Sequence, residues 1–207
     1  MRVYLSRWVC LDVESNLENL RSEAVVAAAS GAELVVFPEG FLHGYTRHID
    51  PGRVRDAFAS VSGAAPGTTF AFGSFTEHRR NRMTVWRGGR ELAAYDKVHL
   101  FPPHNEHLLW DPGERDVAVR LGEHVVGLVC CNDLRFPEQT RRLRLEARAD
   151  IVLAVAWWPW RRDWVWRTLL QARAIENAAW VIGCCVAASE HPDERFAGAG
   201  NYVFDPL

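Results

Sequence analysis

The stretch Val125-Val-Gly-Leu-Val-Cys-Cys-Asn-Asp-Leu-Arg-Phe-Pro-Glu138 carries most of the information about the fold. Its first seven residues form an apolar run that predicts a strand buried on both faces. The polar pair Asn132-Asp133 ends this run, and Pro137 suits the first position of a helix that we expect to continue to about Arg148. A strand that passes through a short turn into a helix is typical of a layered α/β protein.

The rest of the chain repeats this alternation of apolar runs and helical patterns. Ser15 and Glu18 have the spacing of a capping box, which predicts a helix from Ser15 to about Ser30, followed by Gly31 as its left-handed cap. A third helix is expected from Asp163, as its cap, to about Asn177. Further strands are predicted at Glu33–Phe37, Phe70–Phe75, Met83–Trp86, Glu91–Tyr95, Ile151–Trp158 and Trp180–Val186. We expect one α/β domain over residues 1–207, because a single core can grow to roughly 250–300 residues.

The composition excludes several classes of protein. Lys plus Arg number 24 against 26 Asp plus Glu, and the net charge of −2 lacks the basic excess of nucleic-acid-binding proteins. No apolar run approaches the roughly 20 residues that cross a bilayer, so no membrane association is expected. Four of the five cysteines form vicinal pairs inside apolar runs, a poor disulfide framework that favours reduced thiols in the cytoplasm.

Cys131 is the first candidate for chemistry. It ends an apolar strand and precedes a helix, where the partial positive charge of the helix N-terminus favours the reactive thiolate. Its neighbour Cys130 is expected to point to the opposite face of the sheet, because side chains alternate along a strand. From local sequence alone, a buried structural cysteine is the alternative for Cys131.

Glu39 and Lys97 are the second and third candidates. Glu39 follows a predicted strand and Pro38, so it projects from the carboxyl end of that strand, where open α/β sheets place their sites. It could act as a general base, and the alternative is a solvated turn glutamate. Lys97 lies between apolar residues and could stabilise an oxyanion, and the alternative is a surface lysine with a buried stem.

Three segments together resemble the signature blocks of the nitrilase or carbon–nitrogen hydrolase superfamily. They are, in chain order, Val35-Val-Phe-Pro-Glu39-Gly, Tyr95-Asp-Lys97-Val-His-Leu-Phe and Val129-Cys-Cys131-Asn-Asp-Leu-Arg-Phe-Pro-Glu138. A fourth segment, Gln171-Ala-Arg-Ala-Ile-Glu-Asn177, resembles the helix that follows the next strand in that family. The resemblance implies a four-layer α-β-β-α sandwich of the nitrilase type, here with a shortened C-terminus, and a homodimer.

The resemblance also implies a mechanism. Glu39 would be the general base, Lys97 the oxyanion stabiliser and Cys131 the nucleophile that forms a thioester. Glu106 matches a second glutamate beside this triad, and a loop carboxylate is its alternative. The expected substrate is a small carboxamide that releases ammonia or an amine, with no metal or other cofactor. The sequence favours the ω-amidase-like branch, which hydrolyses amides of short dicarboxylates. The alternatives are an N-carbamoyl amino acid hydrolase, a nitrilase, and a catalytically weak binding or scaffold protein.

Four residues are expected to bind the substrate. Trp158 follows the strand after the nucleophile helix, where relatives line the acyl pocket, and Tyr45 lies six residues beyond Glu39. The backbone N–H of Asn132 would help to hold the oxyanion. Arg162 could bind a substrate carboxylate, and a solvated loop arginine is its alternative.

Two other clusters of polar residues could be mistaken for a metal site or for catalytic groups. Three histidines lie close together and could suggest zinc, but two prolines in the stretch and the absence of a cysteine pair at metal spacing argue against it; they are His99, His104 and His107. Three charged residues around the nucleophile are interpreted as ion-pairing and turn-holding; they are Asp133, Arg135 and Glu138. We also expect Arg173 and Glu176 to pair on a helix surface.

The chain departs from the family pattern at four places. Asn132 replaces a common aromatic residue, and Asn201 stands where many relatives have serine. The interval of 58 residues from Glu39 to Lys97 is short, which suggests lost loop or helix material. The sequence stops just after Phe204, where relatives add further strands, so we expect an exposed sheet edge and a weaker dimer.

Overall fold

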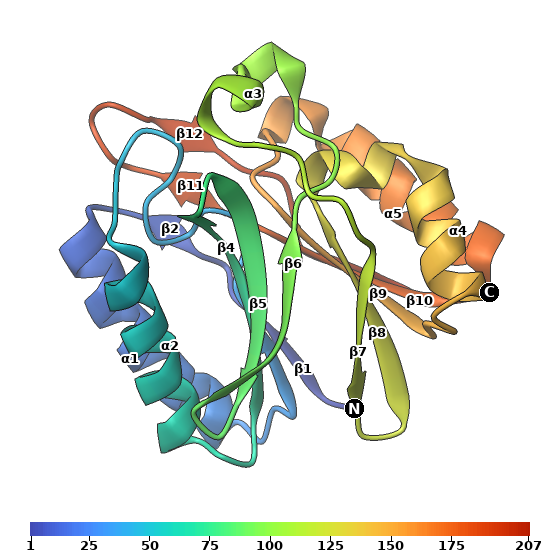
Figure 1. The fold of residues 1–207 in the computed structure, drawn as a ribbon, viewed down its shortest axis with the longest axis horizontal. Coiled ribbons are helices and arrows are strands. Elements are labelled where there is room, and N and C mark those ends of the chain that lie inside the picture. Colours follow the sequence, from blue (N-terminus) through green and yellow to red (C-terminus); the bar gives the residue numbers. More distant parts are fainter.

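The computed structural model describes residues 1–207 and contains two five-stranded sheets packed face to face (Figure 1). The first sheet has the order β1 (Val3–Leu5), β3 (Leu34–Val36), β4 (Thr69–Glu77), β5 (Arg80–Arg87), β6 (Arg90–Asp96). The second has the order β13 (Tyr202–Phe204), β10 (Trp180–Cys185), β9 (Ile151–Ala156), β8 (His124–Cys130), β7 (Val117–Leu121). Three short strands form a third sheet in the order β12 (Phe196–Ala197), β11 (Ala188–Ser189), β2 (Val9–Cys10).

Helices cover the outer face of each large sheet, which confirms the predicted four-layer sandwich. The first sheet is covered by α1 (Val13–Ala29) and α2 (Pro51–Ala64), and the second by α4 (Pro137–Leu145) and α5 (Asp163–Asn177) (Figure 1). A single turn, α3 (Glu106–Leu109), lies at the top of the sandwich. No helix combines the length and apolar character that crossing a bilayer would require.

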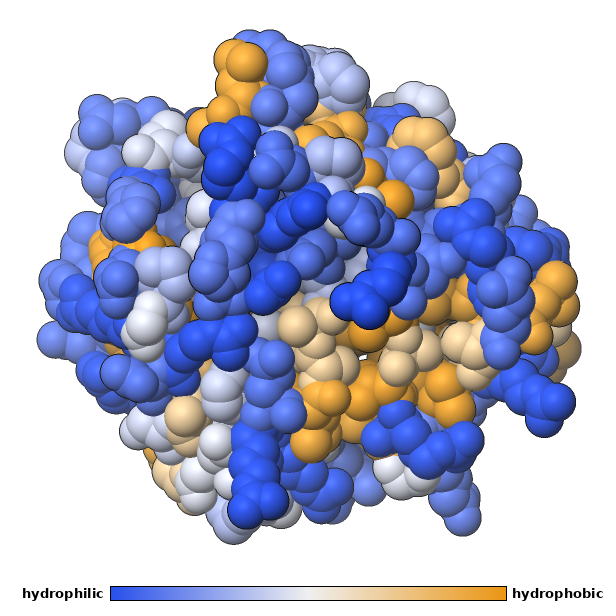
Figure 2. Space-filling view, viewed as in Figure 1, coloured by the Kyte–Doolittle hydropathy of each residue, from blue (hydrophilic) through white to orange (hydrophobic).

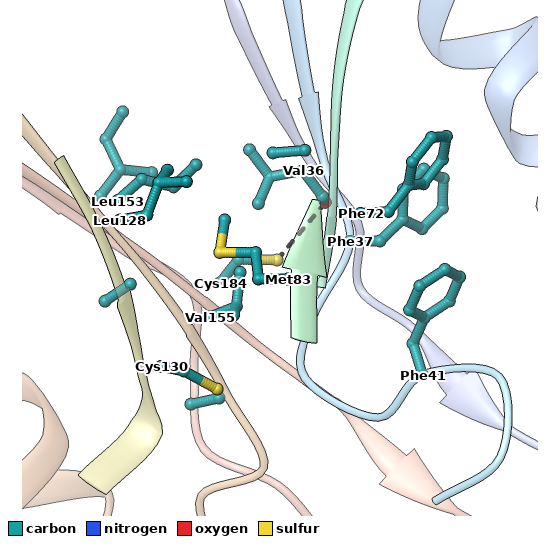
Figure 3. Packing of buried hydrophobic residues seen from close by; sticks show 14 of the residues in the cluster. Val36, Phe37, Phe41, Phe72, Met83, Leu128, Cys130, Leu153, Val155 and Cys184 are labelled. Atoms are coloured by element: carbon teal, nitrogen blue, oxygen red, sulfur yellow. Dashed lines mark hydrogen bonds between the residues drawn. The ribbon is translucent and has the colours of Figure 1, made fainter. Parts of the chain in front are cut away.

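The core between the sheets is built from the inward side chains of both. Figure 3 shows Met83 and Val36 from the first sheet facing Val155 and Cys184 from the second, and all four are fully buried. The Cys184 sulfur lies 3.5 Å from the carbonyl oxygen of Val36, so the sheets are in close contact here. Burial of this kind removes the apolar runs from water and supplies most of the stabilisation of the sandwich.

A second apolar layer lies between the first sheet and its helices. The Phe58 ring in α2 stacks on Phe72 in β4 with a centroid separation of 3.9 Å, and Phe37 and Phe41 continue the stack toward the site (Figure 3). Apolar side chains also gather on the surface of the molecule, where the edge strands β6 and β7 of the two sheets run side by side (Figure 2).

Several element boundaries differ from the sequence predictions. The first helix begins at Val13 because Asp12, not Ser15, is its N-cap, and the Asp12 carboxylate accepts from the Ser15 N–H at 3.0 Å. The helix at Pro137 ends at Leu145, before the predicted limit. Asp163 is the first residue of its helix, and its carboxylate instead accepts from the Gly200 N–H at 2.7 Å.

Helix α2 was not predicted at all. Its start has a clear signal, because Asp50 caps the Arg53 N–H at 2.9 Å and Pro51 occupies the first turn. The strand predicted at 151–158 is also shorter, since β9 ends at Ala156 and the chain turns away into the site.

Candidate active site

Glu39 lies three residues beyond the end of β3 and is fully buried. Its Oε1 accepts hydrogen bonds from Lys97 Nζ at 2.9 Å and from Asn81 Nδ2 at 3.0 Å. Its Oε2 accepts from the backbone N–H of Trp157 at 2.8 Å. A carboxylate held by three donors on both oxygens has one fixed orientation, which excludes the solvated turn glutamate that was its alternative.

Lys97 lies just after β6 and bridges two buried carboxylates. Its Nζ donates to Glu39 Oε1 and to Glu106 Oε1, both at 2.9 Å, and its side chain has no exposed surface. Glu106, in α3, also accepts from Tyr45 Oη at 3.1 Å and from the Phe101 N–H at 2.7 Å. The structure therefore brings Glu39, Lys97 and Glu106 together in one ion network, and Lys97 is not a surface lysine.

Cys131 follows directly after β8 and begins a short 3₁₀ turn. Its φ of 51° lies in the left-handed region, which costs a non-glycine residue about 1–2 kcal/mol. Strained backbone of this kind is often found at functional sites, where the surrounding structure holds it in place. Cys131 lines a pocket, and the residue as a whole is 8% exposed.

The prediction that Cys130 points away from the site is wrong. Its Sγ lies 3.3 Å from Glu39 Oε1, so both neighbouring thiols face the same carboxylate. The alternation rule applies only within a strand, and the strand ends at Cys130 because Cys131 adopts left-handed backbone. Asp133 supports the turn, since its carboxylate accepts from the N–H of Cys130 at 2.8 Å and from Tyr95 Oη at 2.6 Å.

The buried charges shift the pKa values of the three central groups. Burial alone raises the pKa of Glu39, but the Lys97 ammonium and the hydrogen bonds from Lys97, Cys131 and Trp157 bring it below its ordinary value. Burial and the Glu39 charge raise the pKa of Cys131 well above that of a free thiol. Burial lowers the pKa of Lys97, but the neighbouring anions more than compensate and keep it well above normal. At neutral pH the site thus holds a protonated thiol beside an ionised carboxylate.

Glu106 has the opposite tendency from Glu39. Burial raises its pKa above the ordinary value, although Lys97 acts against this. The pKa values of the two carboxylates that share the Lys97 ammonium are therefore shifted in opposite directions. Such a difference in pKa is typical of sites that both accept and return protons.

The pocket over Cys131 has a volume of about 300 Å³ including its open mouth. All four residues expected to bind substrate lie in its wall; they are Tyr45, Asn132, Trp158 and Arg162. The Asn132 side chain has an additional structural task, because its Nδ2 donates to the carbonyl oxygens of His99 and Leu100 at 3.2 and 3.0 Å.

Five residues of the pocket wall were not predicted as site residues; they are Phe101, His104, Arg135, Trp157 and Pro159. Arg135, interpreted above as a structural ion pair, lines the pocket and places its guanidinium 4.7 Å from the centre of the Trp158 ring. Trp157 lines the pocket and also donates its N–H to Glu39. The cluster of tryptophans around position 160 was the available signal for Trp157. For Arg135 the only signal was its place four residues after Cys131.

The contacts of the remaining polar clusters show what each of them does in the structure. His99 stacks on Phe136 and contacts Asp133 through Nδ1 at 3.0 Å, whereas His104 lines the pocket. No group of three His, Cys, Asp or Glu side chains is arranged to hold a metal ion. Arg173 pairs with Glu176 at 2.8 Å as expected. However, Arg173 is buried and also donates to a backbone carbonyl, so the pair is not a surface feature.

Known proteins resemble this chain in sequence and in fold. The family model for carbon-nitrogen hydrolases matches residues 3–207. The chain belongs to the carbon–nitrogen hydrolase family. This hydrolase is 32% identical to omega-amidase YafV of Escherichia coli strain K12, over 94% of its own chain and 77% of the relative. It is also 32% identical to 2-oxoglutaramate amidase of Bacillus subtilis, over 84% of its own chain and 71% of the relative.

The fold of the hydrolase also matches that of solved structures. One is a variant of the amidase from Nesterenkonia sp. AN1 that carries the acetamide moiety of fluoroacetamide covalently added at its active-site cysteine. The TM-score is 0.84 at 23% identity, and the match covers 99% of the hydrolase and 81% of the other chain. The nitrilase-type sandwich predicted from the signature blocks is confirmed.

Proposed function

We propose that the hydrolase cleaves a small carboxamide through a thioester on Cys131, with Glu39 as general base and Lys97 as oxyanion stabiliser. The observation that carries the proposal is the contact of one ionised carboxylate with both the ammonium and the thiol groups. The names of its relatives support amide hydrolysis, because two are amidases of omega-amide or 2-oxoglutaramate type. The cysteine adduct in the Nesterenkonia amidase supports a cysteine nucleophile.

The first half of the reaction forms the thioester. Glu39 takes the proton of the Cys131 thiol as the sulfur attacks the amide carbon, and the carbonyl oxygen becomes negative. Lys97 and the N–H of Asn132 stabilise this oxyanion. When the C–N bond breaks, Glu39 returns its proton to the departing nitrogen, which leaves as ammonia.

The second half hydrolyses the thioester. A water molecule attacks the acyl carbon and gives a proton to a carboxylate, and Cys131 leaves as a thiol. Glu39 is the carboxylate whose charge acts most strongly on the Cys131 thiol, and Glu106, with its raised pKa, is a second acceptor on the same ammonium. The acid product then leaves through the mouth of the pocket.

The charges in the pocket wall favour a substrate that also carries a carboxylate. The wall contains two guanidinium groups, Arg135 and Arg162, and a single carboxylate, Glu106, which is already paired with Lys97. Burial and the Arg162 charge lower the pKa of His104, so this neighbour is neutral at pH 7. A short dicarboxylate monoamide would place its amide at Cys131 and its free carboxylate near the arginines, where it can form charge-assisted hydrogen bonds.

Intact-mass spectrometry is the direct test of the nucleophile. Incubation with a series of short amides should give a covalent acyl adduct on the wild-type protein and none on Cys131→Ala. Folded Cys131→Ala that still releases ammonia would refute the assignment. An adduct on the wild type also excludes a scaffold without turnover chemistry.

A substrate panel tests the carboxylate preference. Ammonia release should be fastest from a dicarboxylate monoamide, compared with a neutral amide of equal length, an N-carbamoyl amino acid and a nitrile. Arg162→Ala should lower kcat/KM for the charged amide by about 30-fold or more, since losing one partner of a charge pair costs about 2 kcal/mol or more. Arg161→Ala is the matched control, because Arg161 is exposed and lies outside the pocket wall. Equal losses on charged and neutral amides would contradict the preference.

We also propose that residues 1–207 act as one domain, as a homodimer and in the cytoplasm. Two tryptophans near the start of α5, Trp160 and Trp164, are 61% and 71% exposed and would suit a subunit interface. Light scattering of the wild type and of Trp164→Glu tests this assembly. A monomeric wild type would contradict it.

A further inference from the structure

The hydrolase contains two vicinal cysteine pairs whose geometries differ. In β10, Cys184 and Cys185 follow the alternation of the strand. The Cys184 sulfur contacts the carbonyl oxygen of Val36 in the opposite sheet, whereas the Cys185 sulfur contacts that of Trp158, next to its own sheet. These two thiols point to opposite faces and cannot meet.

The pair at the site converges instead. The Cys130 sulfur lies 3.3 Å from Glu39 Oε1, and Cys131, the next residue, lines the pocket, where burial and the charge of the same carboxylate raise the pKa of its thiol. Figure 3 shows the Cys130 sulfur directed from its strand into the space between the sheets. The left-handed backbone of Cys131, with φ of 51°, breaks the alternation that would otherwise direct the two neighbouring thiols to opposite faces.

The two thiols also differ in access. Cys131 lines the pocket, so a small reagent in the pocket reaches its sulfur first. Cys130 has no exposed surface and lies behind the nucleophile. The proposed amide hydrolysis gives Cys130 no role, although it is the second nucleophilic atom on the general base.

We propose that Cys130 is a resolving thiol that closes a disulfide with Cys131 when a hydroperoxide oxidises the nucleophile. Cys131 sulfur attacks the O–O bond of hydrogen peroxide, forming a sulfenic acid and one water. The Cys130 sulfur then attacks the Cys131 sulfur, the S–O bond breaks and a second water leaves. Two thiols and one peroxide thus give one disulfide and two waters, with Glu39 as the carboxylate available to accept the thiol protons.

This disulfide is expected to be reversible. Neighbouring Cα atoms lie about 3.8 Å apart, below the usual range of about 4.4–6.8 Å for disulfide-linked residues. The bond is therefore strained and easily reduced, while its formation keeps Cys131 from the sulfinic state, which is not reduced by ordinary thiols.

Peroxide treatment followed by peptide mass spectrometry tests the proposal. Trypsin places Cys130 and Cys131 together in the peptide Leu121–Arg135. In the wild type this peptide should lose two hydrogens, and dithiothreitol should restore alkylation of Cys131 by iodoacetamide. In Cys130→Ala the peptide should instead gain oxygen, and two or more added oxygens should persist through reduction. Cys130→Ser is the second variant, since its hydroxyl keeps a hydrogen-bonding group beside Glu39 without a sulfur.

Cys185→Ala is the matched control, because it breaks the diverging pair and should behave as the wild type does. The proposal fails if the wild-type peptide gains oxygen without losing hydrogens. It also fails if the Cys130 variants recover alkylation as completely as the wild type. These readouts follow sulfur chemistry and not amide turnover, so the result does not depend on the proposed function.

Discussion

Replacement of Lys97 by methionine should destabilise the protein in a manner that depends on pH. Lys97 is the only cation between two carboxylates whose side chains are each about 1% exposed. Removal of one partner of such a buried ion pair costs about 3–5 kcal/mol, because the other charge is left without compensation. For 207 residues the entropy of unfolding is about 0.4 kcal/mol/K, so the melting temperature should fall by about 7–12 °C at pH 7.

The sign of the pH dependence follows from the two carboxylates. Without Lys97, burial and mutual repulsion raise the folded-state pKa of Glu39 and of Glu106 above the unfolded values. Such groups destabilise the fold above their unfolded pKa values, near 4.3, and cease to do so once they are protonated. The difference in melting temperature from the wild type should therefore shrink as the pH falls from 7 toward 4.

Differential scanning calorimetry of Lys97→Met across this pH range is the assay. Lys97→Met/Glu106→Gln should recover part of the lost stability at pH 7, because it leaves one buried carboxylate where the single variant has two. A melting temperature equal to that of the wild type at pH 7, or a deficit that does not change with pH, would refute the electrostatic reasoning.

Three other changes have defined outcomes. Because the pKa of Glu106 is raised, kcat/KM should fall as the pH drops through that pKa. Glu106→Gln should move this acid limb of the pH profile to lower pH. An unchanged acid limb would exclude Glu106 as a proton acceptor in the reaction. Two arginine partners lower the pKa of Glu77 to about 2, so its stabilisation is present above about pH 4.5 and is lost toward pH 2. Urea titrations of Glu77→Gln and wild type should therefore differ at pH 6 and converge in acid. A methyl group at Gly73 would overlap the carbonyl oxygen of Pro38, so Gly73→Ala should displace Glu39 and lower kcat by about 100-fold, measured by ammonia release.

The sequence was sufficient where a residue's role follows from its neighbours along the chain. The apolar runs placed β4, β8, β9 and β10, and Pro137 placed the start of α4, because these signals are local. The order of the signature blocks brought Glu39, Lys97 and Cys131 into one site. Their contacts span separations that no local pattern reports, such as the 2.8 Å bond from the Trp157 N–H to Glu39.

The errors have an equally physical origin. Cys130 was assigned to the wrong face because the positive φ of Cys131 is set by the packing of the turn, not by a glycine visible in the sequence. Arg135 was interpreted as an ion pair because a charged residue in a turn usually is one, and its contact with Trp158 depends on the next strand. Asp12 and Ser15 both fit a helix cap, and only the backbone distinguishes them.

The two large sheets are drawn almost entirely from successive halves of the chain, residues 3–96 and 117–204. Glu39 lies in the first half and Lys97 follows directly after that half, whereas Cys131 and the N–H of Trp157 lie in the second half. Neither half carries all of the groups proposed for catalysis by itself. A chain divided between Trp110 and Val117 would thus yield two fragments that we expect to be inactive, and ammonia release by their mixture would measure directly how well one sheet docks on the other.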